Sequence, residues 1–171
     1  GVGGLAASGL ALRQGIGAWS VPTVRVTLDG LPRGAEGMTL VQLSDIHVGP
    51  TIGRAFVEAM VRTVNDLRPD AVVITGDLVD GSVEALREHV APLAGLRAKH
   101  GVYFVTGNHE YYSGVDEWTQ ELRRLGVRVL ANERVTLGEG DDAIDLAGVH
   151  DWSARRLEAS RRPDLDRALA G

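Results

Sequence analysis

The sequence predicts an α/β fold with a parallel β-sheet, and three observations lead to this prediction. Short apolar runs, typical of strands covered on both faces, occur at residues 38–43, 71–75 and 102–106. Patterns typical of amphipathic helices separate these runs. Each run also ends abruptly in polar residues. Alternating strands and helices favour parallel strands joined by right-handed crossovers.

The expected helices are marked by apolar periodicity and by their end signals. Residues 53–67 carry apolar side chains every three or four positions, which form one stripe. The members of this stripe are Phe56, Val57, Met60, Val61, Val64 and Leu67. Pro69 ends this helix. Ser82 caps a second helix, which Pro92 interrupts. A third helix is expected at residues 114–125.

Further strands are expected on both sides of this core. Residues 23–28, TVRVTL, alternate polar and apolar side chains, as edge strands do. Three more strands are expected at residues 127–130, 134–137 and 143–149, with a hairpin turn at residues 138–142. Residues 155–170 are expected to be helical and to be broken at Pro163.

Length and composition indicate a soluble chain with one main domain. The 171 residues can bury a sizeable core, and 44% of them are hydrophobic. The formal net charge of −5 disfavours a nucleic-acid partner, because the phosphate backbone attracts basic proteins. Cysteine is absent, which excludes disulfides, zinc–thiolate sites and cysteine nucleophiles.

The first residues differ from the rest of the chain. Residues 1–12 are apolar and uncharged, and they are too short for a bilayer span of about 20 residues. We expect residues 1–20 to be a flexible tail or the remnant of an N-terminal signal or membrane anchor, and residues 21–171 to form the domain. An anchor implies membrane association or the cell envelope; otherwise the chain is expected in the cytoplasm.

Polar side chains follow the three apolar runs at the point where each run ends. Asp45 and His47 follow the first run, Asp77 follows the second, and Asn108 and His109 follow the third. The carboxyl ends of neighbouring parallel strands lie at one edge of a sheet. Each motif is common by itself, but three in succession predict one site.

The chemistry of these side chains points to divalent metal ions. Carboxylate and amide oxygens with imidazole nitrogen, and without sulfur, suit manganese, iron or zinc. The two oxygens of Asp77 allow it to bridge two ions. Two ions about 3.5–4 Å apart can activate water and stabilise an in-line displacement at phosphorus. His109 can protonate the leaving oxygen or hold the phosphate.

The motifs resemble those of the calcineurin-like metallophosphoesterase superfamily. They read Asp-Ile-His from Asp45, Gly-Asp-Leu-Val-Asp from Gly76, and Gly-Asn-His-Glu from Gly107. The residues around these motifs are most similar to those of a bacterial branch of the family, whose members often carry an N-terminal membrane anchor. The resemblance covers residues 24–149 and includes all three motifs.

This resemblance implies a four-layer α/β/β/α sandwich and a centre with two divalent metal ions. It implies Asp45 and His47 on the first ion, Asp77 bridging, and Asn108 on the second. His109 is then the catalytic acid or phosphate-orienting group. Asn108, His109 and Tyr111 are expected to bind substrate, a phosphate mono- or diester or a pyrophosphate. Asp80 is expected to stabilise its loop.

The sequence also departs from the family pattern. Two later histidine motifs of the family are absent, and Asp45, His47, Asp77 and Asn108 are too few ligands for two ions. His150, at the end of an expected strand, is either a further ligand or a polar residue at the rim. We therefore expect a sandwich that is incomplete at its C-terminus, and a segment that is weakly active or inactive alone.

Two other functions remain open at this stage. The first is a non-catalytic or degenerate scaffold of the same fold that binds metal without turnover. The second is a metal-dependent hydrolase for another bond. A hydrolase of the haloacid-dehalogenase type is disfavoured, because it needs Asp-x-Asp where this chain has Asp45 and His47.

Overall fold

The computed structural model describes residues 20–158 and 161–170. The chain divides into two units, Gly1–Gly30 and Leu31–Gly171. Residues 20–30 form no strand, so the strand predicted at residues 23–28 is wrong. Alternation alone does not form a strand, because the backbone groups also need a hydrogen-bonded neighbour. Of the tail or anchor remnant predicted at residues 1–20, residues 1–19 lie outside the described residues.

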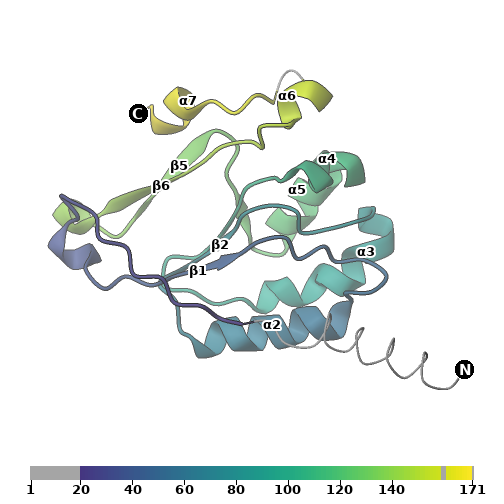
Figure 1. Ribbon diagram of the computed structural model, residues 1–171, viewed down its shortest axis with the longest axis horizontal. Coiled ribbons are helices and arrows are strands. Elements are labelled where there is room, and N and C mark those ends of the chain that lie inside the picture. The colour runs from purple at the N-terminus through teal and green to yellow at the C-terminus, as the bar shows by residue number, and fades with distance from the viewer. Residues whose placement is uncertain (1–19, 159–160, 171) are drawn as a thin grey trace, which may run out of the picture. The chain divides into compact units, whose positions relative to one another are not determined.

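A parallel sheet of four strands forms the centre of the second unit (Figure 1). Its strands are β1 (Leu40–Leu43), β2 (Ala71–Ile74), β3 (Val102–Phe104) and β4 (Arg128–Val129), in that spatial order. The register aligns Leu43 with Ile74, and Ile74 with Phe104. The three predicted core strands therefore end side by side, which confirms the parallel arrangement.

Helices cover one face of this sheet. They are α2 (Arg54–Asp66), α3 (Val83–Val90) and α5 (Val115–Arg124), all close to their predicted bounds. Val57 and Val61 of α2 and Trp118 of α5 pack in one buried cluster with Ile74 and Phe104 of the sheet. None of the described helices has the length and apolar character that a membrane span requires.

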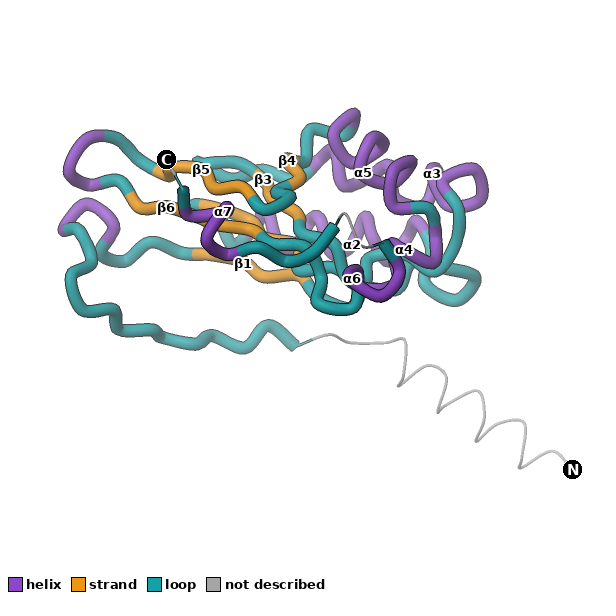
Figure 2. Tube along the Cα trace, turned by 90° about the horizontal axis from the view of Figure 1, so that it is seen from above, coloured by secondary structure: helices purple, strands orange, loops and turns teal. Residues whose placement is uncertain are grey.

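A second sheet covers the opposite face. Its antiparallel strands are β5 (Glu133–Leu137) and β6 (Ile144–Gly148). Two short helices, α6 (Ala154–Leu157) and α7 (Leu165–Leu169), follow, and α7 lies against β5 and β6. Figures 1 and 2 show the resulting helix–sheet–sheet–helix layers. This is the α/β/β/α sandwich that the resemblance implies.

Strand β1 is less covered than the sequence predicts. Leu40 and Gln42 are exposed, although this strand was expected to be buried on both faces. The reason is its position at the edge of the sheet. The buried cluster between the two sheets contains Ala71, Tyr103 and Leu130, from β2, β3 and the end of β4, but no residue of β1.

Helix α4 (Asn108–Ser113) was not predicted, and it begins where β3 ends. Its third residue, Glu110, is fully buried. One carboxylate oxygen of Glu110 accepts hydrogen bonds from the backbone N–H of Gly107, at 2.7 Å, and of Asp77, at 3.0 Å. The other accepts from the N–H of Leu78 at 2.8 Å. Glu110 therefore ties the loop after β2 to the start of α4.

Burial raises the pKa of Glu110, and the three backbone donors oppose this effect. Replacing Glu110 with glutamine leaves one oxygen for three donors and turns an N–H₂ group towards backbone N–H groups. We predict that E110Q lowers the free energy of unfolding by about 3 kcal/mol, since buried donors without acceptors cost about 1–3 kcal/mol each.

Urea denaturation of both proteins checks this prediction. The matched control is E139Q, at an exposed glutamate of the β5–β6 connection, which should unfold like the wild type. Equal stabilities of E110Q and E139Q would show that Glu110 does not hold the two loops together.

Candidate metal centre

Three of the four predicted ligands have an unusual backbone conformation. Asp45, His47 and Asp77 have φ angles of +54°, +50° and +50°. Among the described residues, the other non-glycine residues with positive φ are Arg68 and Asn132. The left-handed region costs a residue with a side chain about 1–3 kcal/mol. Such strain is typical of functional sites, and three predicted ligands share it.

The loop after β1 runs beside the loop after β2. The backbone N–H of His47 donates to the carbonyl of Asp77 at 3.0 Å, and that of Val48 donates to the carbonyl of Leu78 at 2.8 Å. The N–H of Asp45 donates to the carbonyl of Gly76 at 3.3 Å. These bonds continue the pairing of β1 with β2 beyond the ends of the strands.

Two glycines allow the loop after β3 to approach the loop after β2. A Cβ atom on Gly76 would lie 2.3 Å from the backbone nitrogen of Gly107. A Cβ atom on Gly107 would lie 2.1 Å from the Oδ1 atom of Asp77. Side chains cannot be accommodated at such distances, so both positions require glycine. The backbone N–H of His109 also donates to Asp77 Oδ1 at 3.0 Å.

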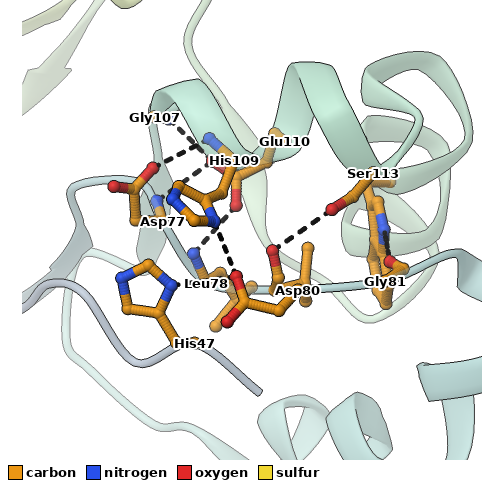
Figure 3. A network of polar contacts seen from close by, with 11 residues as sticks. His47, Asp77, Leu78, Asp80, Gly81, Gly107, His109, Glu110 and Ser113 are labelled. Carbon is orange, nitrogen blue, oxygen red and sulfur yellow. Dashed lines mark hydrogen bonds and ion pairs between the residues drawn. The ribbon is translucent and has the colours of Figure 1, made fainter. Parts of the chain in front are cut away.

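Three side chains converge where these loops meet (Figure 3). His47, Asp77 and His109 each offer a ligand atom, and these atoms all lie within 4.8 Å of one another. The rings of His47 and His109 meet edge to face, with centroids 4.5 Å apart. Two imidazoles and a carboxylate suit a divalent ion such as manganese, iron or zinc. The geometry therefore supports one metal position directly.

The remaining predicted site residues lie around this group. Asp45 is exposed on the loop after β1, and its carboxylate contacts the hydroxyl of Ser44. Asn108 is the first residue of α4, directly before His109. The structure thus brings His47 and Asp77 together with His109, which was predicted as the acid and not as a ligand. The separate roles of Asp45, Asn108 and His109 stay predictions.

Asp80 holds both histidines. Its Oδ1 atom lies 2.9 Å from Nδ1 of His47 and 2.6 Å from Nδ1 of His109. The hydrogen bond with Asp80 raises the pKa of His47. Burial by itself raises the pKa of Asp80, but its hydrogen bonds with the two histidines outweigh burial and lower it. Metal-binding histidines commonly give their second ring nitrogen to such a carboxylate.

Asp80 was predicted to stabilise its loop, and the structure shows that it also contacts both histidines. The position of Asp80, three residues after Asp77, indicated that it lies near the site. Its contacts could not be predicted, because they depend on the positions of His47 and His109. Tyr112 also lies beside His109. Its exposed ring lies 5.9 Å from that of His109, again edge to face.

Tyr111 and His150 form a polar contact at the rim. The Tyr111 hydroxyl lies 3.1 Å from Nδ1 of His150 and 3.1 Å from the hydroxyl of Thr106. Burial raises the pKa of Tyr111 and lowers that of His150. His150 therefore contacts Tyr111 and lies outside the group of His47, Asp77 and His109. Substrate binding by Tyr111 stays a prediction.

The pair of His47 and Asp80 predicts a pH-dependent stability in chelator-treated protein. Because the pKa of His47 is raised above 6.5, the stabilisation is present below that value and is lost as the pH rises through the raised pKa. Because the pKa of Asp80 is lowered from 3.8, stabilisation is lost on the acid side only below that value. The stabilisation by the pair of His47 and Asp80 is therefore fully present between pH 3.8 and pH 6.5.

We predict that D80N lowers the melting temperature more at pH 5.5 than at pH 8.5. Thermal unfolding by circular dichroism in excess chelator measures this difference. The exposed D141N variant is the control and should show no such pH dependence. An equal effect of D80N at both pH values would contradict the prediction.

Comparison with known families and proteins agrees with this geometry. Residues 38–165 match the family described as calcineurin-like phosphoesterase. A bovine "transmembrane protein with metallophosphoesterase domain" is 47% identical over 160 residues, which cover 89% of this chain and 36% of the relative. An uncharacterized metallophosphoesterase of Helicobacter pylori is 38% identical over 148 residues, covering 86% of this chain and 39% of the relative.

An uncharacterized metallophosphoesterase of Aquifex aeolicus is 36% identical over 132 residues, which cover 77% of this chain and 49% of the relative. This chain thus spans less than half the length of each of these three relatives. The family match covers the strand-end loops that carry His47, Asp77 and His109. On the basis of this match and these identities, the chain belongs to the calcineurin-like phosphoesterase family.

Proposed function

We propose that this chain carries the metal centre of a phosphoesterase that hydrolyses phosphate mono- or diesters, or pyrophosphate bonds, with two divalent metal ions. The observation that carries the proposal is the convergence of His47, Asp77 and His109 within 4.8 Å at the ends of three loops. Membership of the family supports the same reaction class. The substrate is not specified by these residues.

The proposed ligands are Asp45 and His47 for one ion, Asp77 for both, and Asn108 for the other. The ions would supply Lewis acidity, which polarises phosphoryl oxygens and makes water more acidic. These four residues are fewer ligands than two ions require. We therefore predict that this chain alone hydrolyses phosphate esters weakly or not at all.

His109 is the proposed acid. Its Nδ1 atom is held by Asp80 at 2.6 Å, which fixes the plane of the ring and leaves Nε2 for the substrate. A protonated Nε2 can donate a hydrogen bond to the leaving oxygen or to a phosphoryl oxygen. The backbone N–H of His109 meanwhile orients Asp77 through Oδ1.

A metal-binding scaffold without turnover is the second candidate. The observation that favours it is that the three converging side chains suffice for one ion. Metal content separates the two functions, because the enzyme requires about two ions per chain, whereas the scaffold holds one or none. We also propose membrane association, which rests on the bovine relative being named a transmembrane protein.

Replacement of Asp77 tests the ligand assignment. D77N replaces one of the two carboxylate oxygens shared by the proposed ions with an amide nitrogen that cannot bind them. We expect Mn²⁺ affinity to fall at least about tenfold and the hydrolysis of bis-p-nitrophenyl phosphate to be lost. Isothermal titration with Mn²⁺ and a colorimetric assay measure the two effects. D66N, at an exposed position of α2, is the control, and unchanged Mn²⁺ binding by D77N would refute the ligand assignment.

Replacement of His109 distinguishes a role as the acid from a role as a metal ligand. If His109 is the acid, H109N lowers kcat about 10²–10⁴-fold for an alkyl phosphate, whose leaving group needs a proton. It lowers kcat much less for p-nitrophenyl phosphate, whose leaving group needs none, and Mn²⁺ affinity is nearly unchanged. Equal losses for both esters, with weaker Mn²⁺ binding, would identify His109 as a ligand instead.

A further inference from the structure

The segment after β6 forms a hollow of about 470 Å³ on the protein surface. It is lined by Trp152, Arg156, Arg162 and Pro163. Trp152 and Arg156 belong to the turn and helix α6, whereas Arg162 and Pro163 lead into α7. The volume is in the range of sites that hold small molecules. The chemistry of its lining is aromatic and cationic.

One wall of the hollow is held by Asn132, which is 6% exposed and has a φ angle of +58°. Its amide nitrogen donates to the backbone carbonyl of Arg162 at 2.8 Å. Its amide oxygen accepts from the backbone N–H of Asp164 at 3.0 Å and of His150 at 3.3 Å. Asn132 thus joins the end of β6 to the segment that carries Arg162.

The opposite side of Arg162 is held by its neighbour Arg161. The guanidinium of Arg161 donates to Asp116 of α5 at 2.5 Å and pairs with Glu158 at 2.8 Å. These contacts keep Arg161 occupied, and they position the backbone of the segment without the side chain of Arg162. The backbone at Arg162 is therefore held from two sides without use of its side chain, which lowers the entropy lost when that side chain binds a ligand.

The two arginines that line the hollow are exposed, and neither forms an ion pair with any residue that the structure describes. The whole chain has a net charge of −5, so two arginines that pair with no described carboxylate at one hollow differ from the overall charge of the chain. A guanidinium offers a planar fork of donors that matches a phosphate. Trp152, 65% exposed, offers an indole face beside them.

The hollow is lined by a segment that contacts the helix of the metal centre. Helix α6 contacts α4, the helix that begins at Asn108 and carries His109 (Figures 1 and 2). Tyr111 of α4 contacts His150, two residues before Trp152, through its hydroxyl. The residues that line the hollow are thus joined to the proposed site through these two contacts.

We propose that this hollow is a second-anion subsite, in which Arg156 and Arg162 bind a phosphate group away from the reacting one and Trp152 stacks on a planar ring. The class of ligand is a diphosphate attached to a ring, as in a nucleoside diphosphate. The inference rests on the proposed phosphoesterase function and specifies its substrate. Bidentate arginine contacts and ring stacking supply the recognition.

Binding to chelator-treated protein tests the subsite without hydrolysis. Isothermal titration compares ADP, pyrophosphate and adenosine as probes. We expect ADP and pyrophosphate to bind and adenosine to bind much more weakly. The double variant R156Q/R162Q should lose at least tenfold in affinity for both anions. W152A should weaken ADP binding at least threefold and leave pyrophosphate binding unchanged, whereas W152F should restore ADP binding.

The matched control is R62Q/R123Q, which removes the same charge at exposed arginines of α2 and α5. Circular dichroism verifies that all variants are folded. Equal loss of ADP binding in the control and the test variant, or no loss in either, would overturn the subsite. So would an effect of W152A on pyrophosphate as large as that on ADP, because the indole is then not a stacking surface.

The outcome is independent of the proposed activity. Since metal is absent during the titrations, a chain without hydrolysis can still show the subsite. Conversely, a chain that hydrolyses esters while wild type and R156Q/R162Q bind ADP equally would retain the proposed function and exclude the subsite.

Discussion

The distance between the loops after β2 and β3 is the constraint on which the rest of the centre depends. Gly76 and Gly107 approach so closely that a methyl group on either would overlap the other loop. This approach carries Asp77 to the backbone N–H of His109. Parallel pairing of β1 with β2, continued into the loops, adds His47 to the same place. A wider spacing would separate the three side chains.

Close approach has an energetic cost that buried contacts offset. Asp45, His47 and Asp77 occupy left-handed backbone conformations, each unfavourable by about 1–3 kcal/mol. The Glu110 carboxylate accepts three backbone hydrogen bonds in a fully buried position and so holds two of the loops against this strain. Asp80 then fixes both histidine rings through one oxygen. The rigid sheet behind these loops allows the strain to persist.

The second sheet has a different part in the protein. It covers β2, β3 and the end of β4. The segment that follows it contains α6, which contacts α4. The segment from His150 to α7 is then held by Asn132 and Arg161, and these anchors leave Trp152, Arg156 and Arg162 at the surface. The proposed metal centre and the proposed anion subsite therefore lie on different segments, each with its own supporting contacts.

The sequence by itself determined the order of strands β1 to β6, the helices α2, α3 and α5 between them, and the loops that carry the site, because apolar periodicity, Gly, Pro and capping residues act over a few positions. It could not determine α4, whose Glu110 bonds to a distant loop, or the exposure of β1, which depends on how far the second sheet extends. The prediction of a strand at residues 23–28 was wrong because a strand also needs a hydrogen-bonded neighbour from another part of the chain. Only the tertiary structure decided that His109 joins His47 and Asp77, that Asp80 serves both rings, and that two arginines share a hollow, since contacts between distant residues decide each of these.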